Sequence, residues 1–234
     1  MKRKDNEDDN TQKKKCKKEM ISRVEMLERL INVRQDIVAQ VDVFGTQQLY
    51  NSSMSLKTKD EITAAAMLRL HQLENGLTIS SIRKLTISEL DQLLIPVGFH
   101  KKKAHQILTI AKTLEESYDN DIPQTTLELY QQMQLPGIGP KVARLIMLVA
   151  WKKADGIIVD THVHRISHRL GWTSKEAAKF AEASRRELEE WVPRQHWPQF
   201  SQALIGFGQS YCSSLHPKCS LCPLSDHCPY FCNT

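Results

Sequence analysis

The chain lacks the apolar run of about 20 residues that a membrane-spanning helix requires. Its opening residues also lack the pattern of a secretory signal peptide, so we expect an intracellular chain in which disulfide bonds are rare. Convincing alternation of apolar and polar residues is missing as well, which argues against half-buried strands. A membrane protein, a disulfide-stapled secreted domain and a sheet protein are therefore all disfavoured.

A strong excess of one charge is also missing from most of the chain. The 234 residues carry 32 Lys and Arg against 27 Asp and Glu, a net charge of +5. Residues 1–20 hold eight of the basic and five of the acidic side chains, so the remainder carries only +2. If the folded part binds a nucleic acid, its basic surface must come from local arrangement instead of bulk charge.

Residues 1–20 form a charged tail that we expect to be disordered. Its two basic clusters, Lys2-Arg3-Lys4 and Lys13-Lys14-Lys15-Cys16-Lys17-Lys18, are separated by acidic and polar residues, as in a two-part nuclear import signal. A solvated extension with no targeting role is the alternative. Because the acidic residues argue against a mitochondrial presequence, the nucleus is the expected compartment, with the mitochondrion as the second candidate.

What the chain does contain is apolar residues at helical spacing in nearly every segment after the tail. The pattern is clear in residues 21–38, 104–114 and 142–149. Thr125 and Thr126 indicate the start of a helix over 124–133, and Pro140 that of a helix over 140–151. The sequence predicts an all-α protein.

Four of the six cysteines lie close together near the C-terminus, spaced C-x6-C-x2-C-x5-C: Cys212, Cys219, Cys222 and Cys228. Thiolates at this density predict one metal centre, either a tetrahedral zinc site or an iron–sulfur cluster. A pair of disulfides is the weaker alternative in an intracellular chain. Zinc sites usually present two C-x2-C pairs and only one is present, so the spacing favours a [4Fe–4S] cluster.

The segment Leu135-Pro136-Gly137-Ile138-Gly139-Pro140-Lys141 joins the last two predicted helices. Gly137 and Gly139 allow a sharp turn and leave no Cβ in the way of a close approach. Backbone N–H groups of such a turn and of a helix start can bind a phosphate oxygen. We interpret the segment as a helix–hairpin–helix that binds the DNA backbone irrespective of base sequence. The alternative is a tight turn with glycine for steric reasons only.

Two charged residues near this hairpin are candidates for chemistry. Lys141 falls in the first helical turn, where the helix dipole disfavours an ammonium, and burial between apolar helices would disfavour it further. A neutral amine is what a Schiff-base nucleophile needs, although a solvated lysine that contacts phosphate is the commoner case. Asp160, in V-D-T-H-V-H-R, fits a helix N-cap and also a carboxylate that stabilises a sugar cation. We expect His162, His164 and His168 to pack or cap.

The hairpin, the V-D-T-H-V-H-R segment and the cysteine spacing together resemble the endonuclease III family of DNA base-excision glycosylases, from about Leu56 to Cys228. The resemblance implies a six-helix barrel domain that carries the hairpin, over residues 46–151, beside a cluster domain built from residues 21–45 and 152–234. It implies an enzyme of base excision repair, a bifunctional DNA N-glycosylase and AP lyase. Such an enzyme acts as a monomer on double-stranded DNA that contains an oxidised pyrimidine or an abasic site, and flips the damaged base out of the duplex.

The resemblance also implies roles for single residues. Lys141 matches the nucleophile that attacks C1′ and forms an imine before β-elimination, and Asp160 matches the catalytic carboxylate. The four cysteines match the ligands of a [4Fe–4S] cluster with a structural and DNA-positioning role. Lys57 stands where the family usually has a Gln that fills the gap left by the flipped base, and His216 and Lys218 are expected phosphate contacts. Adenine glycosylases of the same superfamily lack the lysine, which favours the bifunctional interpretation.

One departure from the family lies near residues 47–56. The family has a strongly apolar helix there, whereas residues 47–54 are few and polar, so one barrel helix is missing. A buried helix makes several contacts worth about 2–5 kcal/mol each, against a total stability of about 5–15 kcal/mol. Two alternatives to an active enzyme therefore stay open. One is a catalytically impaired DNA-binding variant, such as an isoform or the product of an incorrect gene model, and the other is a zinc-bound nucleic-acid module.

Overall fold

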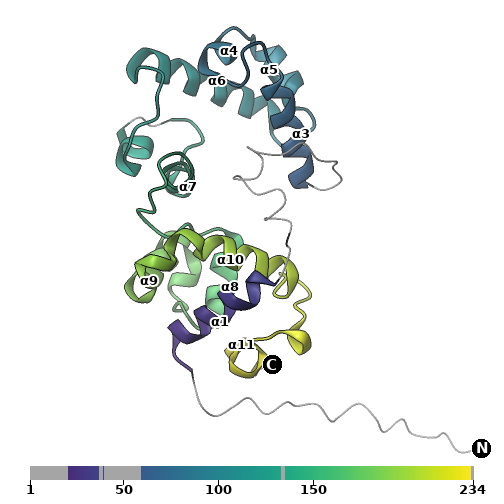
Figure 1. Cartoon of the computed structure of the whole chain (residues 1–234), viewed down its shortest axis with the longest axis vertical. Coiled ribbons are helices and arrows are strands. Elements are labelled where there is room, and N and C mark those ends of the chain that lie inside the picture. Colours follow the sequence, from purple (N-terminus) through teal and green to yellow (C-terminus); the bar gives the residue numbers. More distant parts are fainter. Residues whose placement is uncertain (1–20, 37–38, 40–58, 133–134, 233–234) are drawn as a thin grey trace, which may run out of the picture.

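The computed structural model describes residues 21–36, 39, 59–132 and 135–232. Every regular element within these ranges is a helix, which confirms the all-α prediction. Figure 1 shows α3 to α6 gathered in one group and α1 with α8 to α11 in another, with α7 between the two groups. No helix among the described residues is both long and apolar enough to span a membrane.

The larger group, which we call the C-terminal unit, combines the first described helix with the last four. Its α-helices are α1 (Arg23–Gln35), α8 (Thr161–Arg169), α9 (Ala181–Trp191), α10 (Trp197–Ser210) and α11 (Pro229–Cys232). Short 3-10 turns connect them: η2 (Ala177–Lys179), η3 (Arg194–His196), η4 (Cys219–Leu221) and η5 (Ser225–His227). Its core is rich in large side chains that are at least 98% buried, among them Trp172, Phe200 and Phe207. Burial of such side chains contributes about 1.5–3 kcal/mol each.

The α3–α6 unit contains α3 (Lys59–His71), α4 (Ile79–Arg83), α5 (Ile87–Leu94) and α6 (His100–Ser117). Helix α5 begins with a capping box, in which Thr86 and Glu89 each accept the other's backbone N–H. Leu90 on α5 and Ala104 on α6 are fully buried between the helices. The small Ala104 allows α6 to pack closely on its neighbours.

The hairpin unit is smaller and consists of the short π-helix η1 (Glu128–Gln132) followed by α7 (Pro140–Ala150). The predicted helix over 124–133 begins later than expected, and its predicted end lies outside the described residues. The Thr125 hydroxyl accepts the N–H of Glu128 at 3.2 Å, and this cap sets the helix start a residue or more later than predicted. The predicted helix over 140–151 is confirmed, with Pro140 at its first position.

The described residues form three separate apolar clusters instead of one continuous core. Leu129, Ala143 and Met147 make up the buried part of the hairpin cluster, which is distinct from the cluster of the α3–α6 unit. Several apolar residues of α7 are only half-buried, and Val142 is 37% exposed. The predicted loss of a barrel helix falls at residues 47–56, outside the described residues, so it stays a prediction.

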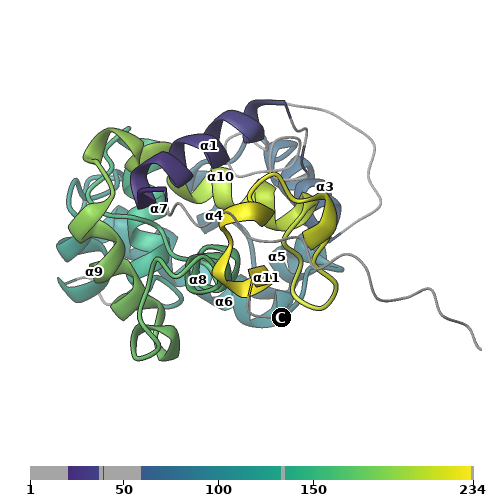
Figure 2. The same ribbon diagram turned by 90° about the horizontal axis from the view of Figure 1, so that it is seen from below.

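The tightest contact in the C-terminal unit lies where α1 crosses α10. Figure 2 shows the two helices side by side. The buried Arg34 side chain lies so close to Gly206 that a Cβ at this position would be 1.9 Å from its Nε atom. An added Cβ at position 206 would therefore displace the buried Arg34 guanidinium from the surface of α10.

We expect Gly206→Ala to destabilise the fold by about 1–3 kcal/mol, because overpacking forces α1 and α10 apart. For a chain of this size the melting temperature falls by about 2–4 °C per kcal/mol. Gly98→Ala is the matched control, since no atom lies within 4 Å of its added Cβ. Thermal unfolding followed by circular dichroism measures both, and equal melting temperatures for the two variants would contradict the packing argument.

Candidate active site and metal centre

The hairpin between η1 and α7 has a backbone that depends on glycine at one position. Gly137 has a φ of +85°, in the region that favours glycine, and the N–H of Ile138 donates to the carbonyl of Leu135 at 3.1 Å. Gly139 is the N-cap of α7 and makes no side-chain cap. An added Cβ at Gly139 would have no neighbour within 4 Å, so this turn presents bare backbone to the outside. The first N–H groups of α7 can therefore bind an anion there.

Lys141 is the second residue of α7 and borders a cavity of about 200 Å³ between α7 and α9. The other lining residues are Pro140, Arg144, Val159, Ala181, Glu182 and Arg185. Lys141 itself is exposed. Burial between apolar helices, which would have favoured a neutral amine, is therefore absent, because the first turn of α7 projects beyond the apolar cluster of the hairpin unit. In its exposure Lys141 matches the alternative of a solvated lysine.

Asp160 is the N-cap of α8, as one of its two predicted roles required. Its Oδ1 atom accepts the N–H of Val163 at 2.8 Å, and the side chain is half-buried. The preceding residue, Val159, lies on the cavity that Lys141 borders. His164 packs as predicted, since its two ring nitrogens contact the hydroxyl of Ser184 at 2.9 Å and the carbonyl of Ala178 at 2.8 Å.

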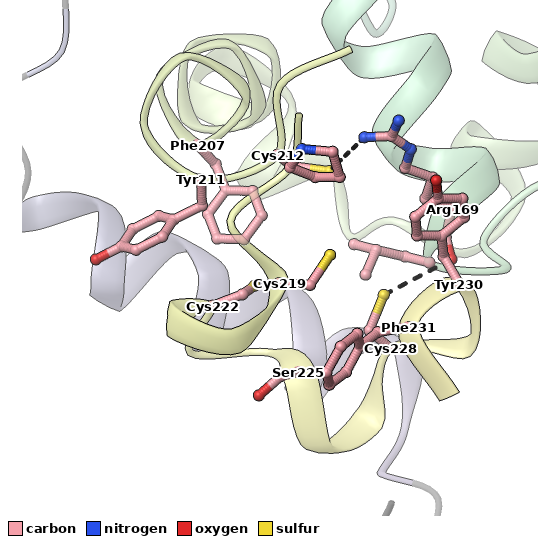
Figure 3. Close-up of a pocket in the computed structure, with 12 residues that line it drawn as sticks. Arg169, Phe207, Tyr211, Cys212, Cys219, Cys222, Ser225, Cys228, Tyr230 and Phe231 are labelled. Carbon is pink, nitrogen blue, oxygen red and sulfur yellow. Dashed lines mark hydrogen bonds between the residues drawn. The ribbon is translucent and has the colours of Figure 1, made fainter. Parts of the chain in front are cut away.

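The four cysteines of the C-terminal spacing line one cavity, drawn in Figure 3. None of them is in a disulfide, so the disulfide alternative is wrong for these residues. No three His, Cys, Asp or Glu side chains of the described chain are arranged to hold a single metal ion. A tetrahedral zinc site would draw all four sulfurs to about 2.3 Å from one point. The thiols instead surround a common space.

Helix α8 holds the cysteine loop in place through two arginines. Arg169 donates to the Cys212 sulfur at 3.2 Å and to the carbonyls of Ser213 and Ser214 at 2.7 and 2.9 Å. Arg165 donates to the Cys212 carbonyl at 2.8 Å. Sequence reasoning missed both arginines. Their spacing of four residues on one helix face was a visible signal, although nothing in the sequence indicated what that face contacts.

Burial raises the pKa of the Cys222 thiol to about 11 and also raises the pKa of Cys219 and Cys228. The same thiols repel one another when charged, which adds to the effect. At neutral pH the cluster-free chain therefore keeps these groups protonated. Loading a metal group would release protons, so a fall in pH would oppose loading.

Two of the three predicted DNA contacts outside the hairpin lie among the described residues. His216 and Lys218 are exposed in the loop between Cys212 and Cys219, whose ends are joined by the N–H of Lys218 donating to the carbonyl of Tyr211 at 2.8 Å. Lys57 lies outside the described residues. The structure adds Phe99, which is 84% exposed at a φ of 58°. It lies two residues before three exposed lysines, Lys101 to Lys103, in the first turn of α6.

Residues 52–194 match the family described as HhH-GPD superfamily base excision DNA repair protein. The chain belongs to this superfamily. It is 40% identical to endonuclease III-like protein 1 of Gallus gallus over 220 residues, which cover 88% of this chain and 76% of that protein. It is 46% identical to the Bos taurus protein of the same name over 183 residues, covering 78% of this chain and 58% of that protein. The predicted membership of the endonuclease III family is confirmed.

Solved structures of the HhH-GPD superfamily share the fold of this chain. A trapped endonuclease III–DNA covalent intermediate has a TM-score of 0.64 at 22% identity, over 90% of this chain and 97% of that one. A thermostable thymine-DNA glycosylase has a TM-score of 0.72 at 18% identity, over 90% and 96%. These likenesses confirm the predicted helix–hairpin–helix glycosylase fold. Together with the family match, the chain is a member of a family of base excision repair enzymes.

Proposed function

We propose that the chain is a bifunctional DNA N-glycosylase and AP lyase that removes oxidised pyrimidines from double-stranded DNA. The observation that carries the proposal is Lys141 at the mouth of a cavity, directly after a glycine hairpin that presents bare backbone. Because the bovine relative extends well beyond the matched region, the activity of the whole protein is assigned here as a proposal. The substrate class rests on the family resemblance.

The residues divide the reaction between them. N–H groups of the hairpin and of the α7 start hold a phosphate, which brings the sugar of a flipped nucleotide to the cavity. The Lys141 amine attacks C1′, the C1′–N bond breaks, and the base leaves with its electron pair and then takes up a proton. The nitrogen lone pair then opens the C1′–O4′ bond, and O4′ takes up a proton that the attacking amine has lost, so that an imine forms at C1′. This imine acidifies C2′, and loss of a C2′ proton breaks the C3′–O bond and expels the 3′ phosphate. Asp160 keeps one carboxylate oxygen for its cap and uses the other to stabilise the cationic sugar.

Exposed side chains outside the hairpin also suit contacts with a duplex. Phe99 is an apolar side chain in a sparsely populated backbone conformation, followed by Lys101 to Lys103, which suits insertion between bases with phosphates held by the lysines. His216 and Lys218 suit phosphate contacts at the cysteine loop. Lys57 remains a proposed filler of the gap left by the flipped base.

The lining of the cysteine cavity suits a thiolate-ligated metal group, and the C-x6-C-x2-C-x5-C spacing favours a [4Fe–4S] cluster over a zinc ion. Cys212, Cys219, Cys222 and Cys228 would hold the group, because all four side chains line one space. Arg169 places an N–H donor on one of the sulfurs, as an anionic thiolate prefers. When bound, the cluster supplies a rigid scaffold for the loop that carries His216 and Lys218.

A second candidate function is that of a DNA-binding variant with impaired catalysis. The observation that favours it is the incomplete cover of α7, several of whose apolar residues are only half-buried. Such a chain would bind abasic DNA through the hairpin without forming the imine. We also propose import into the nucleus, with the mitochondrion as a second destination. The charged tail on which this proposal rests lies outside the described residues. The monomeric state is likewise a proposal.

Borohydride reduction in the presence of abasic duplex DNA separates the two candidates. The enzyme should give a covalent protein–DNA adduct, and Lys141→Gln should reduce its yield by at least about 100-fold because the nucleophile is gone. Lys112→Gln, an exposed lysine on α6, is the matched control and should trap like the parent chain. DNA binding without any adduct would support the impaired variant and sink the lyase proposal.

Iron and zinc analysis of the purified chain tests the metal centre. We expect about four iron atoms per chain and an absorbance near 400 nm, as a [4Fe–4S] cluster requires. Cys222→Ser should lose both signals, whereas Cys16→Ser, outside the spacing, should keep them. One zinc per chain and no visible absorbance would contradict the cluster assignment.

A further inference from the structure

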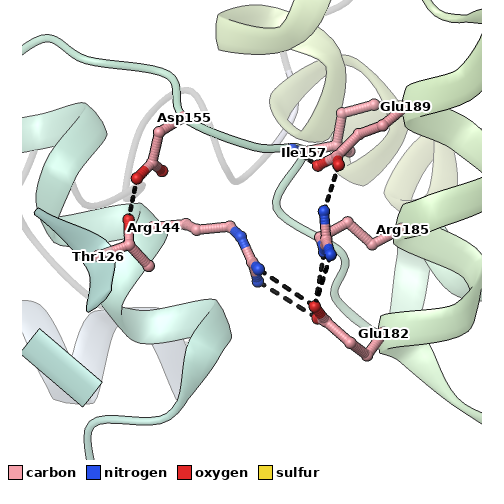
Figure 4. Close-up of polar contacts among 7 residues, drawn as sticks. All are labelled: Thr126, Arg144, Asp155, Ile157, Glu182, Arg185 and Glu189. Atoms are coloured by element: carbon pink, nitrogen blue, oxygen red, sulfur yellow. Dashed lines mark hydrogen bonds and ion pairs between the residues drawn. The ribbon is translucent and has the colours of Figure 1, made fainter. Parts of the chain in front are cut away.

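An unbroken set of polar contacts joins α7 to the C-terminal unit beside the cavity, and Figure 4 shows its members. The Arg144 guanidinium donates through Nη1 and Nη2 to the two carboxylate oxygens of Glu182, at 3.3 and 3.2 Å. Arg185 donates to the same carboxylate through Nε at 2.8 Å and also pairs with Glu189. Glu189 in turn accepts the backbone N–H of Ile157 at 2.8 Å.

This set is built into the fold more firmly than an ordinary surface ion pair. The side chains of Arg144 and Arg185 are only 10% and 16% exposed, so solvent screens them less than it screens surface pairs. The two-pronged geometry of Arg144 on Glu182 also fixes direction as well as distance. Gly156 leaves the room that the network needs, since a Cβ there would lie 2.8 Å from the Arg144 Nε.

The network spans the two walls of the cavity that Lys141 borders. Arg144 lies three residues after Lys141, so both side chains project from the same face of α7. Glu182 and Arg185 belong to the opposite wall, formed by α9. The far end of the network holds Ile157, three residues before Asp160. The position of Lys141 relative to Asp160 is therefore set by contacts that pass through Arg144.

We propose that Arg144 is a positioning residue, which through Glu182 fixes the Lys141 helix at the distance from Asp160 that imine formation requires. The inference rests on the proposed lyase function and deepens it. A displacement of about 1 Å can cost about 100-fold in rate. A variant that breaks the Arg144–Glu182 contact should therefore lose rate with its nucleophile intact.

The variants are chosen so that they fold. In Arg144→Met the Glu182 carboxylate still has Arg185 as a partner, so no charge is left buried and unpaired. Glu182→Gln removes the charge and one of the two acceptors from the α9 side without altering α7, and the remaining amide oxygen still gives the buried Arg144 a hydrogen-bond partner. Arg186→Met is the matched control, an exposed arginine on the same helix as Glu182.

The first measurement is the single-turnover rate of borohydride-trappable imine formation at saturating abasic DNA. Arg144→Met and Glu182→Gln should each slow it by at least about tenfold, with the dissociation constant for DNA unchanged within about twofold. The double variant should be no slower than the slower single variant, because one contact is removed in each case. A purely structural role would lower the melting temperature and leave the rate at saturation as it was.

Amide hydrogen exchange at Ile157 supplies a second measurement that needs no chemistry. Exchange should become at least about tenfold faster in Arg144→Met and Glu182→Gln, and stay unchanged in Arg186→Met. If the parent chain traps DNA but the variants match it within twofold, the positioning inference fails while the lyase function stands. If the parent chain forms no adduct, the lyase function fails. In that case amide exchange at Ile157 still tests the network, because an unchanged exchange rate in all three variants would show that Arg144 and Glu182 do not hold Ile157.

Discussion

The structure depends most on the packing of α8 against α10. Val163 and Ile166 on α8 are fully buried in this contact. Gly208 on α10 allows the approach, because a Cβ there would lie 2.6 Å from the His162 ring and 3.0 Å from Ile166. Close packing of this kind is sensitive to a single added methyl group. The packing of α8 against α10 therefore fixes the positions of both ends of α8.

Those two ends carry the parts that matter for function. At the N-terminal end Asp160 caps the helix beside the Lys141 cavity, and at the C-terminal end Arg169 holds the Cys212 loop. Helix α8 is nine residues long, so the proposed catalytic carboxylate and the cysteine cavity are joined by one rigid element about 14 Å in length. A metal group bound in the cysteine cavity would therefore act on the proposed active site by holding this helix still, without taking part in the proposed reaction.

The sizes of the apolar clusters indicate how firmly each unit is held by its own core. The C-terminal unit has a large core of its own, whereas the hairpin cluster contains three buried apolar residues among those that the structure describes. Its α7 must be held largely by contacts with neighbouring units, and Arg144 makes the most defined of these. An ion pair usually contributes little to stability. In this arrangement the Arg144–Glu182 pair instead fixes the position of α7, which carries the proposed nucleophile Lys141.

Much of the fold followed from the sequence, because helical periodicity and caps are local signals. The start of α7 at Pro140 and the capping role of Asp160 were both predicted from neighbouring residues. The sequence left both a buried and a solvated Lys141 open, because its exposure depends on where the apolar cluster of the hairpin unit ends. Arg144 and Arg169 were missed for a similar reason. Their partners, Glu182 and Cys212, lie 38 and 43 residues away, and no local pattern links them.

The most direct test of the account is to identify the residue that becomes attached to DNA. The borohydride-reduced adduct with abasic DNA should be digested with nuclease and protease, and the modified peptide sequenced by mass spectrometry. The account predicts a reduced sugar remnant on Lys141 alone. A remnant on Lys57, on a lysine of the tail or on the terminal amine, with Lys141 unmodified, would contradict it.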